Sequence, residues 1–586
     1  MDRNASRRVD WAAAVVWRSA RLRARLLRLW LWLRLTTRGA VVAGAAGVIL
    51  SLHNPALGAG GPPIRAATIT VAAGEVAVAD NGLCSLIEAI HNANDTTTGA
   101  VHADCAAGDP AAEGMDTIAL PATSIFALTA ADNQTYGASG LPVITGRTTI
   151  SGSYGTAIRR DAAAEPFRVL AVGRAGELAL DWVTISGGQT TTTPSRAAEV
   201  TYATSGGGIL NLGDLHLLQT TISGNRAAVG GGVYNAGGLL ASQANFTHNH
   251  AAYDGAALLS FGDSRLYDAD VRENDDPFSI AVVVNEGYMK LEGGYIRDNG
   301  PSTSLSNRGE LTIYGVVFEN SIVGLDNTGQ LTMEAAVFSG HHTAVTNSAT
   351  ALVNRTAIID NDQGISNGRG HLTLVNSTIS GNHTSRAGGG VEVWGGTVEG
   401  LFNTITDNTA ARGGGVFVAG HYDDFYNCTA GSMSLRYSII SGNQATITIG
   451  REAYTEQGTF RCHGSLFLKG SLAGHDGDAG IVNASLIGNF VPDEPAAAIL
   501  SPEWTSSAAW TPHHTLPWGS PAVDALPNEA CELPPPFYAF DQLFNDRNVD
   551  GDFRPSANEC DIGAIERPPL PYHVFTPFAG REEARR

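Results

Sequence analysis

The stretch from Gly206 to Asn443 alternates two short phrases, Thr221-Ile222-Ser223-Gly224-Asn225 and Gly230-Gly231-Gly232-Val233-Tyr234-Asn235. Related copies of each phrase recur every 20 to 26 residues, and the two series stay in register with each other. Aligning the first phrase on its last residue gives a ladder of Asn225, Asn249, Asn274, Asn299, Asn320, His341, Asn361, Asn382 and Asn408. The second phrase gives a ladder of Asn211, Asn235, Ser260, Asn285, Asn307, Asn327, Asn347 and Asn367, continued by Val393 and Val418.

This fixed period predicts a solenoid, because heptads are absent and Gly and Asn turns are frequent. Between the ladder positions lie short runs in which apolar and polar residues alternate, such as Gly309-Glu310-Leu311-Thr312-Ile313-Tyr314. That alternation is typical of half-buried strands. Leucine-rich repeats have a similar period but need leucines at fixed offsets, which these coils lack. The sequence therefore predicts an all-β fold, a parallel β-helix whose coils stack at the strand spacing of about 4.8 Å.

The ladder Asn residues are expected at the turns that end strands, where Asn accepts a left-handed backbone and bonds nearby peptide groups. If the coils stack, the side-chain amides also pair from coil to coil. We therefore predict that these residues have a structural rather than a ligand-binding role. The prediction is most specific for one column of Asn285, Asn307, Asn327, Asn347 and Asn367.

Residues 1–59 have the order of a signal peptide with a long basic start. Ten Arg residues lie within residues 1–38, and an apolar run extends from Gly39 to Leu52. A basic N-terminal anchor that is not cleaved is the alternative, although this run is too short to span a bilayer as a free helix. We expect a secreted or cell-surface protein with no membrane span in its mature chain.

The charge balance narrows the possible partners. The chain has 37 basic and 57 acidic side chains and a formal charge of -20, and removing residues 1–59 would leave 27 against 55. Nucleic-acid binding is therefore not expected, because it needs a basic surface. Such a charge favours solubility and repulsion from anionic lipid, and it allows cation binding.

The six cysteines fall into three neighbouring pairs. These are Cys84 with Cys105, Cys428 with Cys462, and Cys531 with Cys560. Disulfides are expected in an exported chain, but six cysteines allow 15 pairings, and proximity in the sequence is the only reason to prefer these three. A zinc site is the alternative, although no CxxC spacing is present.

A capping segment is expected before the coils, because the open end of a β-helix exposes core and unpaired strand. Ser85-Leu86-Ile87-Glu88 is a capping box that starts a short helix, whose predicted apolar face is Leu86, Ile87, Ala89, Ile90 and Ala93. The run Cys84-Ser85-Leu86-Ile87-Glu88-Ala89-Ile90 resembles the CSLREA motif of bacterial surface β-helix proteins, with Ile87 where that motif has Arg. This resemblance covers about residues 66–190 and implies a right-handed, pectate-lyase-like β-helix, with residues 60–145 as its cap and 146–490 as its coils.

Two further resemblances point to surface proteins. Gly232-Val233-Tyr234-Asn235 and Phe246-Thr247-His248-Asn249 are similar to the GGxI and FxxN repeats of polymorphic outer-membrane proteins. After residues 491–518, which we expect to be a linker, residues 519–566 resemble the choice-of-anchor Q domain through phrases such as Cys560-Asp561-Ile562-Gly563-Ala564-Ile565-Glu566. The tail of 567–586 has no apolar run or sorting motif, so release and anchoring are both compatible with it.

A calcium loop is the one metal site that the sequence suggests. Asp546, Asn548 and Asp550 supply oxygens at positions 1, 3 and 5, and Gly551 stands at position 6, as in the first half of such a loop. Position 12 is Ala557, where a bidentate Glu is needed. We therefore favour an Asp-rich surface turn over a calcium site.

The residues that directly precede the positions of the first ladder suggest a candidate catalytic site. They include Glu273, Asp298 and Glu319 on three successive coils, which would form a column with steps of about 5 Å, a spacing that suits a retaining carboxylate pair. A polysaccharide lyase or glycoside hydrolase is therefore the alternative function. Solvated acids at turns explain the pattern equally well, and the chain lacks resemblance to the signatures of those enzymes. We favour a non-catalytic scaffold for adhesion or for binding a polysaccharide or a matrix ligand.

Overall fold

The computed structural model describes residues 66–95, 100–109, 114–190, 200–274, 281–422, 427–447, 450–456, 462–505, 511–526, 541–543 and 560–565. The chain divides into two compact units, residues 1–63 and 64–586, and all described residues belong to the second. The expected signal peptide or anchor and the tail of 567–586 lie outside the described residues.

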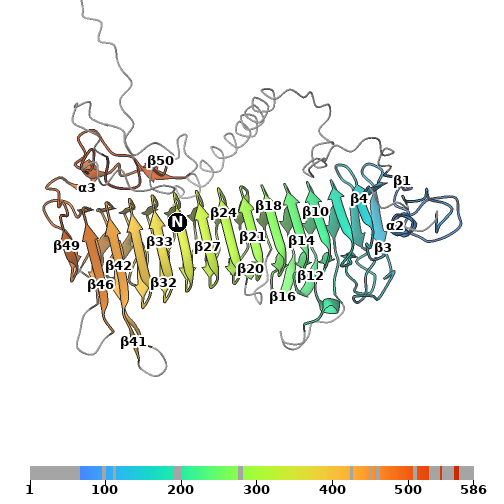
Figure 1. Cartoon of the computed structure of the whole chain (residues 1–586), viewed down its shortest axis with the longest axis horizontal. Coiled ribbons are helices and arrows are strands. Elements are labelled where there is room, and N and C mark those ends of the chain that lie inside the picture. The colour runs from blue at the N-terminus through green and yellow to red at the C-terminus, as the bar shows by residue number, and fades with distance from the viewer. Residues whose placement is uncertain are drawn as a thin grey trace, which may run out of the picture. The chain divides into compact units, whose positions relative to one another are not determined.

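Three long parallel sheets form a parallel β-helix, as the repeat predicts, and each successive coil adds one strand to each sheet (Figure 1). The first, sheet A, consists of β1 (Thr68–Thr70), β2 (Asp116–Ala119), β4 (Arg147–Ser151), β7 (Glu177–Asp181), β10 (Asp214–Leu218), β14 (Gly238–Ser242), β18 (Asp263–Tyr267), β21 (Tyr288–Glu292), β24 (Glu310–Tyr314), β27 (Gln330–Glu334), β30 (Thr350–Asn354), β33 (His371–Val375), β36 (Thr397–Leu401), β42 (Gly431–Arg436), β46 (Gly464–Lys469) and β49 (Ser485–Ile487). The second, sheet B, consists of β3 (Ile125–Leu128), β5 (Ala157–Arg160), β8 (Thr184–Ser186), β11 (Thr221–Ser223), β15 (Asn245–Thr247), β19 (Asp270–Arg272), β22 (Tyr295–Arg297), β25 (Val317–Glu319), β28 (Val337–Ser339), β31 (Ala357–Ile359), β34 (Thr378–Ser380), β37 (Thr404–Thr406), β43 (Ile439–Ile440) and β47 (Leu472–Ala473).

The third, sheet C, carries the second ladder. It consists of β6 (Leu170–Val172), β9 (Ile209–Asn211), β13 (Val233–Asn235), β17 (Leu258–Ser260), β20 (Ala281–Asn285), β23 (Thr303–Asn307), β26 (Val323–Asn327), β29 (Thr343–Asn347), β32 (Gln363–Gly368), β35 (Val391–Trp394), β39 (Val416–Ala419), β45 (Ala453–Thr455) and β48 (Ile481–Val482). Four strand pairs stand outside the three sheets, namely β12 (Arg226–Val229) with β16 (His250–Asp254), β38 (Thr409–Ala410) with β44 (Gln444–Ala445), β40 (His421–Tyr422) with β41 (Cys428–Thr429), and β50 (Trp504–Thr505) with β51 (His513–His514).

The second ladder forms the predicted column. Asn285, Asn307, Asn327, Asn347 and Asn367 are register partners on successive strands of sheet C. All five side chains are fully buried, and the Nδ2 of each of the first four donates to the Oδ1 of the next, at 2.7–2.8 Å. Each amide thus satisfies its neighbour's hydrogen-bonding groups away from water, which confirms the structural role.

The first ladder lies at the turn that follows sheet B. There each Asn that is followed by another Asn on the next coil donates both its backbone N–H and its Nδ2 to the Oδ1 of that residue, as from Asn382 to Asn408, at 3.1 and 2.8 Å. The sequence alignment is wrong at one coil. Ser321, not Asn320, occupies the ladder position, because its N–H and Oγ contact Nδ1 of His341 on the next coil at 3.2 and 2.8 Å.

The first ladder ends on a carboxylate. Glu452 accepts hydrogen bonds from the N–H and Nδ2 of Asn443, at 3.1 and 2.7 Å, and from the N–H of Gly442. Burial raises the pKa of Glu452 to about 7, and the Asn443 bonds partly offset this rise. Glu452 thus gives the final amide of the column an acceptor where the run of Asn side chains stops.

The N-terminal cap contains the predicted helix, α2 (Leu86–Asn94), with both hydrogen bonds of the Ser85–Glu88 capping box. Four of the five predicted apolar residues are buried, whereas Ile87 is only partly buried. The polar Asn92 is also buried in this helix, and its Nδ2 donates to the carbonyls of His102, Cys105 and Ala106.

Two of the three predicted disulfides are present, Cys84–Cys105 and Cys428–Cys462. The Cys84–Cys105 bond links the start of α2 to the loop of residues 102–106, whose carbonyl groups accept hydrogen bonds from the Asn92 side chain. For the third pair, Cys531 lies outside the described residues.

The segment expected to be a linker packs against the coils. It contains α3 (Ala496–Ile499) and the β50–β51 pair, and the buried His514 joins its Nε2 to Oγ of Ser380 in sheet B at 2.7 Å. Further along, Gln542 Oε1 accepts from Thr378 Oγ1 at 2.6 Å. These contacts cover part of the outer face of sheet B. None of the described hydrogen bonds of this segment reaches sheet C. The 3₁₀ helix η3 (Tyr202–Thr204) completes the described elements.

Replacing Asn327 with Leu should lower the free energy of unfolding by about 2–5 kcal/mol, because it removes partners from Asn307 Nδ2 and Asn347 Oδ1 inside the protein. The control is Thr332→Leu, an exposed position on sheet A of the same coil, where a change within about 0.5 kcal/mol is expected. Chemical denaturation of both variants measures the difference. Equal midpoints for the two variants would contradict the structural role of the column.

His341→Asn should alter the pH dependence of stability. Burial lowers the pKa of His341 to about 4, below its ordinary value of 6.5, so the unfolded chain binds the extra proton first and the native protein loses stability as pH falls from 6.5 towards 4. The variant lacks this loss and should gain about 2 kcal/mol over the native protein between pH 7 and pH 4.5. Denaturation at both pH values measures the gain, and a stability difference that does not change with pH would count against the buried neutral imidazole.

Candidate functional site

The three predicted acidic residues do not form one column. Glu273 and Asp298 occupy the left-handed turn position after sheet B, at φ of 55° and 53°, and both are exposed. On the next coil this position belongs to Asn320, whose Nδ2 donates to Asp298 Oδ1 at 2.8 Å. Glu319 is one residue earlier, at the end of β25, in register with Arg297. The expected column is therefore wrong for Glu319, for the same reason as the ladder error at Asn320.

These acids nevertheless belong to a charged cluster on the outer face of sheet B. Asp270 lies 2.9 Å from Arg297 and 3.2 Å from Arg272, and Glu273 lies 3.4 Å from Arg272 and 3.2 Å from the imidazole of His248. Most members are substantially exposed, so each pair contributes little to stability. The cluster is a network of paired surface charges in which four acids face two arginines.

Glu319 has the most perturbed environment in this cluster. Burial raises its pKa, Arg297 opposes the rise, and the negative charges of Asp298 and Asp270 add to it. A raised pKa beside a second carboxylate is what a general acid requires. Catalysis also needs a pocket that binds the substrate next to those groups.

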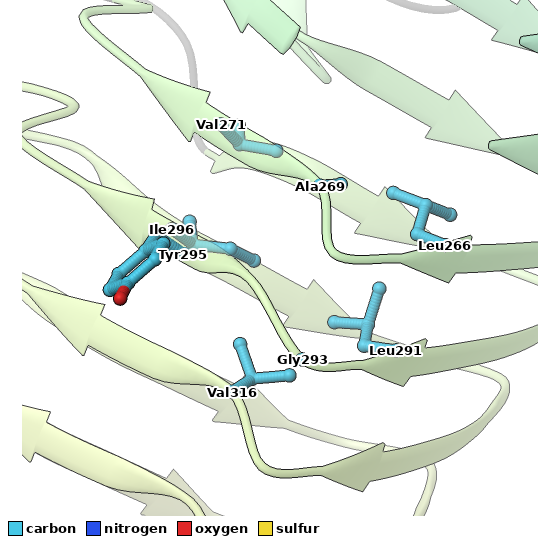
Figure 2. Close-up of a pocket in the computed structure, with 8 residues that line it drawn as sticks. All are labelled: Leu266, Ala269, Val271, Leu291, Gly293, Tyr295, Ile296 and Val316. Atoms are coloured by element: carbon cyan, nitrogen blue, oxygen red, sulfur yellow. The ribbon is translucent and has the colours of Figure 1, made fainter. Parts of the chain in front are cut away.

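The cavity nearest this cluster is small, apolar and inside the coil. It offers about 10 Å³ and lies behind β19, β22 and their preceding turns (Figure 2). Such a space holds one water molecule at most, so it is no substrate site. Its lining residues are Leu266, Ala269, Val271, Leu291, Gly293, Tyr295, Ile296 and Val316.

The described residues contain neither a candidate metal site nor a membrane-spanning helix. Among them, no group of three or more His, Cys, Asp or Glu side chains is arranged to hold a metal ion. The candidate calcium ligands Asp546, Asn548 and Asp550 lie outside that part of the chain. Within the same described ranges, no helix has the length and apolar character required to cross a membrane.

A second surface, on the outer face of sheet C, combines aromatic rings with charge. We call Glu392, Trp394, Arg412, Phe417 and Tyr454 the Trp394 surface. The Trp394 and Phe417 ring centroids are 5.8 Å apart, Phe417 stacks on Tyr454 at 5.9 Å, and the Arg412 guanidinium lies 5.8 Å from the Tyr454 ring. Trp394 keeps 40% of its surface exposed, so its ring is available to a ligand.

Glu392 is held firmly in this surface. Its Oε2 accepts from Gln363 Nε2 at 2.9 Å and from Ser366 Oγ at 3.4 Å, and the Trp394 side chain also bonds the carboxyl. The side chain is only 9% exposed. Burial raises the pKa of Glu392, and these donors, together with the charge of Arg386, partly offset the rise. The carboxyl therefore has a fixed orientation beside the exposed indole.

A disulfide-linked hairpin borders the Trp394 surface. Ala419 is the register partner of Trp394, and the β40–β41 hairpin begins two residues later. Cys428 at its end is bonded to Cys462. The Trp394 surface thus lies beside a hairpin that a disulfide restrains.

Sequence reasoning missed this surface, although a signal was present. The second ladder changes from Asn367 to Val393 and Val418, and the coil length grows at the same place. A Trp directly after a ladder position, where the preceding coils have Gly, Ser or Thr, marks an outward-facing ring.

Comparisons with known proteins add little to this geometry. No family model matches the chain, so the CSLREA and choice-of-anchor resemblances stay predictions, and no curated protein matches it. A matching solved structure is the A-module of the mannuronan C-5 epimerase AlgE4 of Azotobacter vinelandii, at 16% identity and a TM-score of 0.30, over 66% of this chain and 89% of that one. A similarity this weak carries no argument about function, and the fold assignment rests on the sheet topology.

Proposed function

We propose that this protein is an exported β-helix scaffold, secreted or held at the cell surface, that binds a glycan without transforming it. The observation that carries the proposal is the exposed ring of Trp394 beside the fixed carboxyl of Glu392. Aromatic faces bind the apolar C–H faces of sugar rings, while adjacent polar groups bind the hydroxyls. The Trp394 surface supplies both kinds of group on a rigid sheet.

Export is supported by the two disulfides, because such bonds persist in oxidising compartments. The basic and apolar start of the chain agrees with this localisation, and so do the resemblances to surface proteins. The acidic charge keeps such a scaffold soluble and away from anionic lipid. The CSLREA-like cap and the choice-of-anchor Q-like segment are part of this proposal.

Binding is favoured over hydrolysis at Glu392. A glycosidase uses two carboxyl groups placed on either side of the scissile bond. The strongest influences on the pKa of Glu392, apart from burial, are the neutral donors Trp394, Gln363 and Ser366 and the cation Arg386. This environment orients the Glu392 carboxyl as a hydrogen-bond acceptor, and the other acid bound to this surface, Glu456, is paired with Arg412 at 3.4 Å.

A polysaccharide lyase or hydrolase is the second candidate, and Glu319 is the observation that favours it. Its raised pKa and the neighbouring Asp298 meet one requirement for acid catalysis. The described cavity beside this cluster is apolar and too small for a substrate, which favours the binding proposal.

Trp394→Ala should weaken retention on the glycan ligand by about five- to tenfold, since an aromatic contact is worth roughly 1–1.5 kcal/mol. Affinity chromatography on immobilised neutral and acidic polysaccharides, with and without calcium, measures retention. Trp182→Ala is a matched control, because Trp182 is 44% exposed at a different corner of the coil, after β7. Equal retention of the Trp394 variant and the native protein would refute the assigned site.

The combined variant Glu273→Gln, Asp298→Asn and Glu319→Gln separates the two candidates. If the protein is a scaffold, its glycan retention should stay within about twofold, because these side chains lie on sheet B and not on the Trp394 surface. Reducing-sugar release and the absorbance of unsaturated products are followed in parallel. Product formation by the native protein that disappears in this variant would favour the enzyme.

A further inference from the structure

A second group of aromatic side chains lies on the outer face of sheet C, towards the N-terminal end of the coils. Tyr136, Tyr202, Tyr234 and Phe261 follow one another with ring centroids 6.3, 6.0 and 5.7 Å apart. Phe261 is 50% exposed and Tyr202 37% exposed. The row, here called the Phe261 row, presents contiguous aromatic surface to solvent.

A buried arginine fixes the loops that carry two of these rings. Arg168 is fully buried and donates to the carbonyls of Tyr136 and Ser205, at 2.8 and 2.9 Å, and to the carbonyl of Tyr202. Burial lowers its pKa to about 10. Placing a guanidinium among neutral carbonyls is costly unless every donor is used, and here the donors join two loops that lie 32 residues before and 34 residues after Arg168 in the chain.

The two aromatic groups stand at opposite ends of one column. Phe261 directly follows the ladder residue Ser260, and Trp394 directly follows Val393, so both occupy the same position on their coils. Six strand spacings separate them, or about 29 Å. The residues at this position on the intervening coils are Glu286, Arg308, Thr328, Ser348 and Gly368.

Between the two ends, the side chains that directly follow the ladder positions are polar, whereas the outward-facing Val284 of β20 is fully buried against other residues. Thr328 and Ser348 are exposed, and the neighbouring outward positions on the same strands are Asp326, Thr346 and Ser366. Thr346 donates to Asp326. Such a strip offers hydroxyl and carboxyl groups, and its two bulky side chains, Glu286 and Arg308, are paired with each other towards the Phe261 end.

The charge along this strip disfavours an anionic ligand. Its one arginine, Arg308, is held by Glu286 at 2.6 Å and by Asp254 at 2.9 Å. Asp326 and Glu392 add negative charge, and the whole chain carries -20. A polyanion would meet repulsion along the path, whereas an uncharged chain would not.

From this arrangement we infer that the column of side chains from Phe261 to Trp394, at the end of the sheet C strands, is one continuous binding track for a neutral, linear polysaccharide, which stacks on the Phe261 row at one end and on Trp394 at the other. The inference rests on the proposed function and specifies its ligand. A chain of several sugar units spans both ends, while a disaccharide reaches only one. The two contacts on one chain then reinforce each other through effective concentration.

The full-length protein can be tested against paired polymers with the same backbone, hydroxyethylcellulose and carboxymethylcellulose, and against galactomannan, xylan and polygalacturonate. At least one neutral polymer should bind about 100-fold more tightly than its disaccharide, and the charged polymers should bind more weakly. Phe261→Ala and Trp394→Ala should each reduce polymer affinity about tenfold, with Trp182→Ala unchanged.

A bulky substitution at the middle of the strip tests continuity. Ser348→Arg should reduce binding of the neutral polymer about tenfold by obstructing its path, whereas a polyanion would bind this variant more tightly. If Trp394→Ala weakens binding and Phe261→Ala and Ser348→Arg do not, the continuous track is wrong and the proposed function stands. If no polysaccharide binds, or a protein ligand alone is captured through these residues, both the track and the proposed function are overturned.

Discussion

The fold depends on the hydrogen bond between one asparagine side chain and the next in stacked coils. A buried primary amide is costly unless its donors and acceptor are paired, and here the partner is the same residue one coil away. The requirement fixes the register of the neighbouring strands, because a one-residue shift would leave the amides unpaired. Glu452 supplies the acceptor where the first column ends. Within that column His341 uses Nδ1 to contact Ser321, while its Nε2 is buried without a hydrogen-bond partner among the described residues.

This constraint explains what the sequence could predict. The Asn ladders determine period, strand order and column membership, so the parallel β-helix and the Asn285–Asn367 column follow from spacing alone. The alignment failed at Asn320 because it matched identical residues. The apolar strand residue three positions before each ladder site, Phe318 in that coil and Ile296 in the preceding one, gives the correct register. Contacts between distant segments, such as His514 with Ser380, have no periodic signal and could not be predicted.

The outer faces are free to differ because the interior carries the specificity for the fold. On sheet B, the described part of the C-terminal segment covers some strands and a network of paired charges occupies others. On sheet C, polar side chains extend between the aromatic side chains at Phe261 and Trp394. The rigid coil then holds these two groups at a separation set by the strand spacing, which is a useful property for a protein that binds a long chain.

Hydroxyl-radical footprinting of the protein with and without a neutral polysaccharide is the most direct measurement of this arrangement. Protection of both Trp394 and Phe261, with unchanged oxidation of Trp182, is the predicted result. Protection at the sheet B turns that carry Glu273 and Asp298, with Trp394 and Phe261 left as reactive as in the free protein, would contradict it.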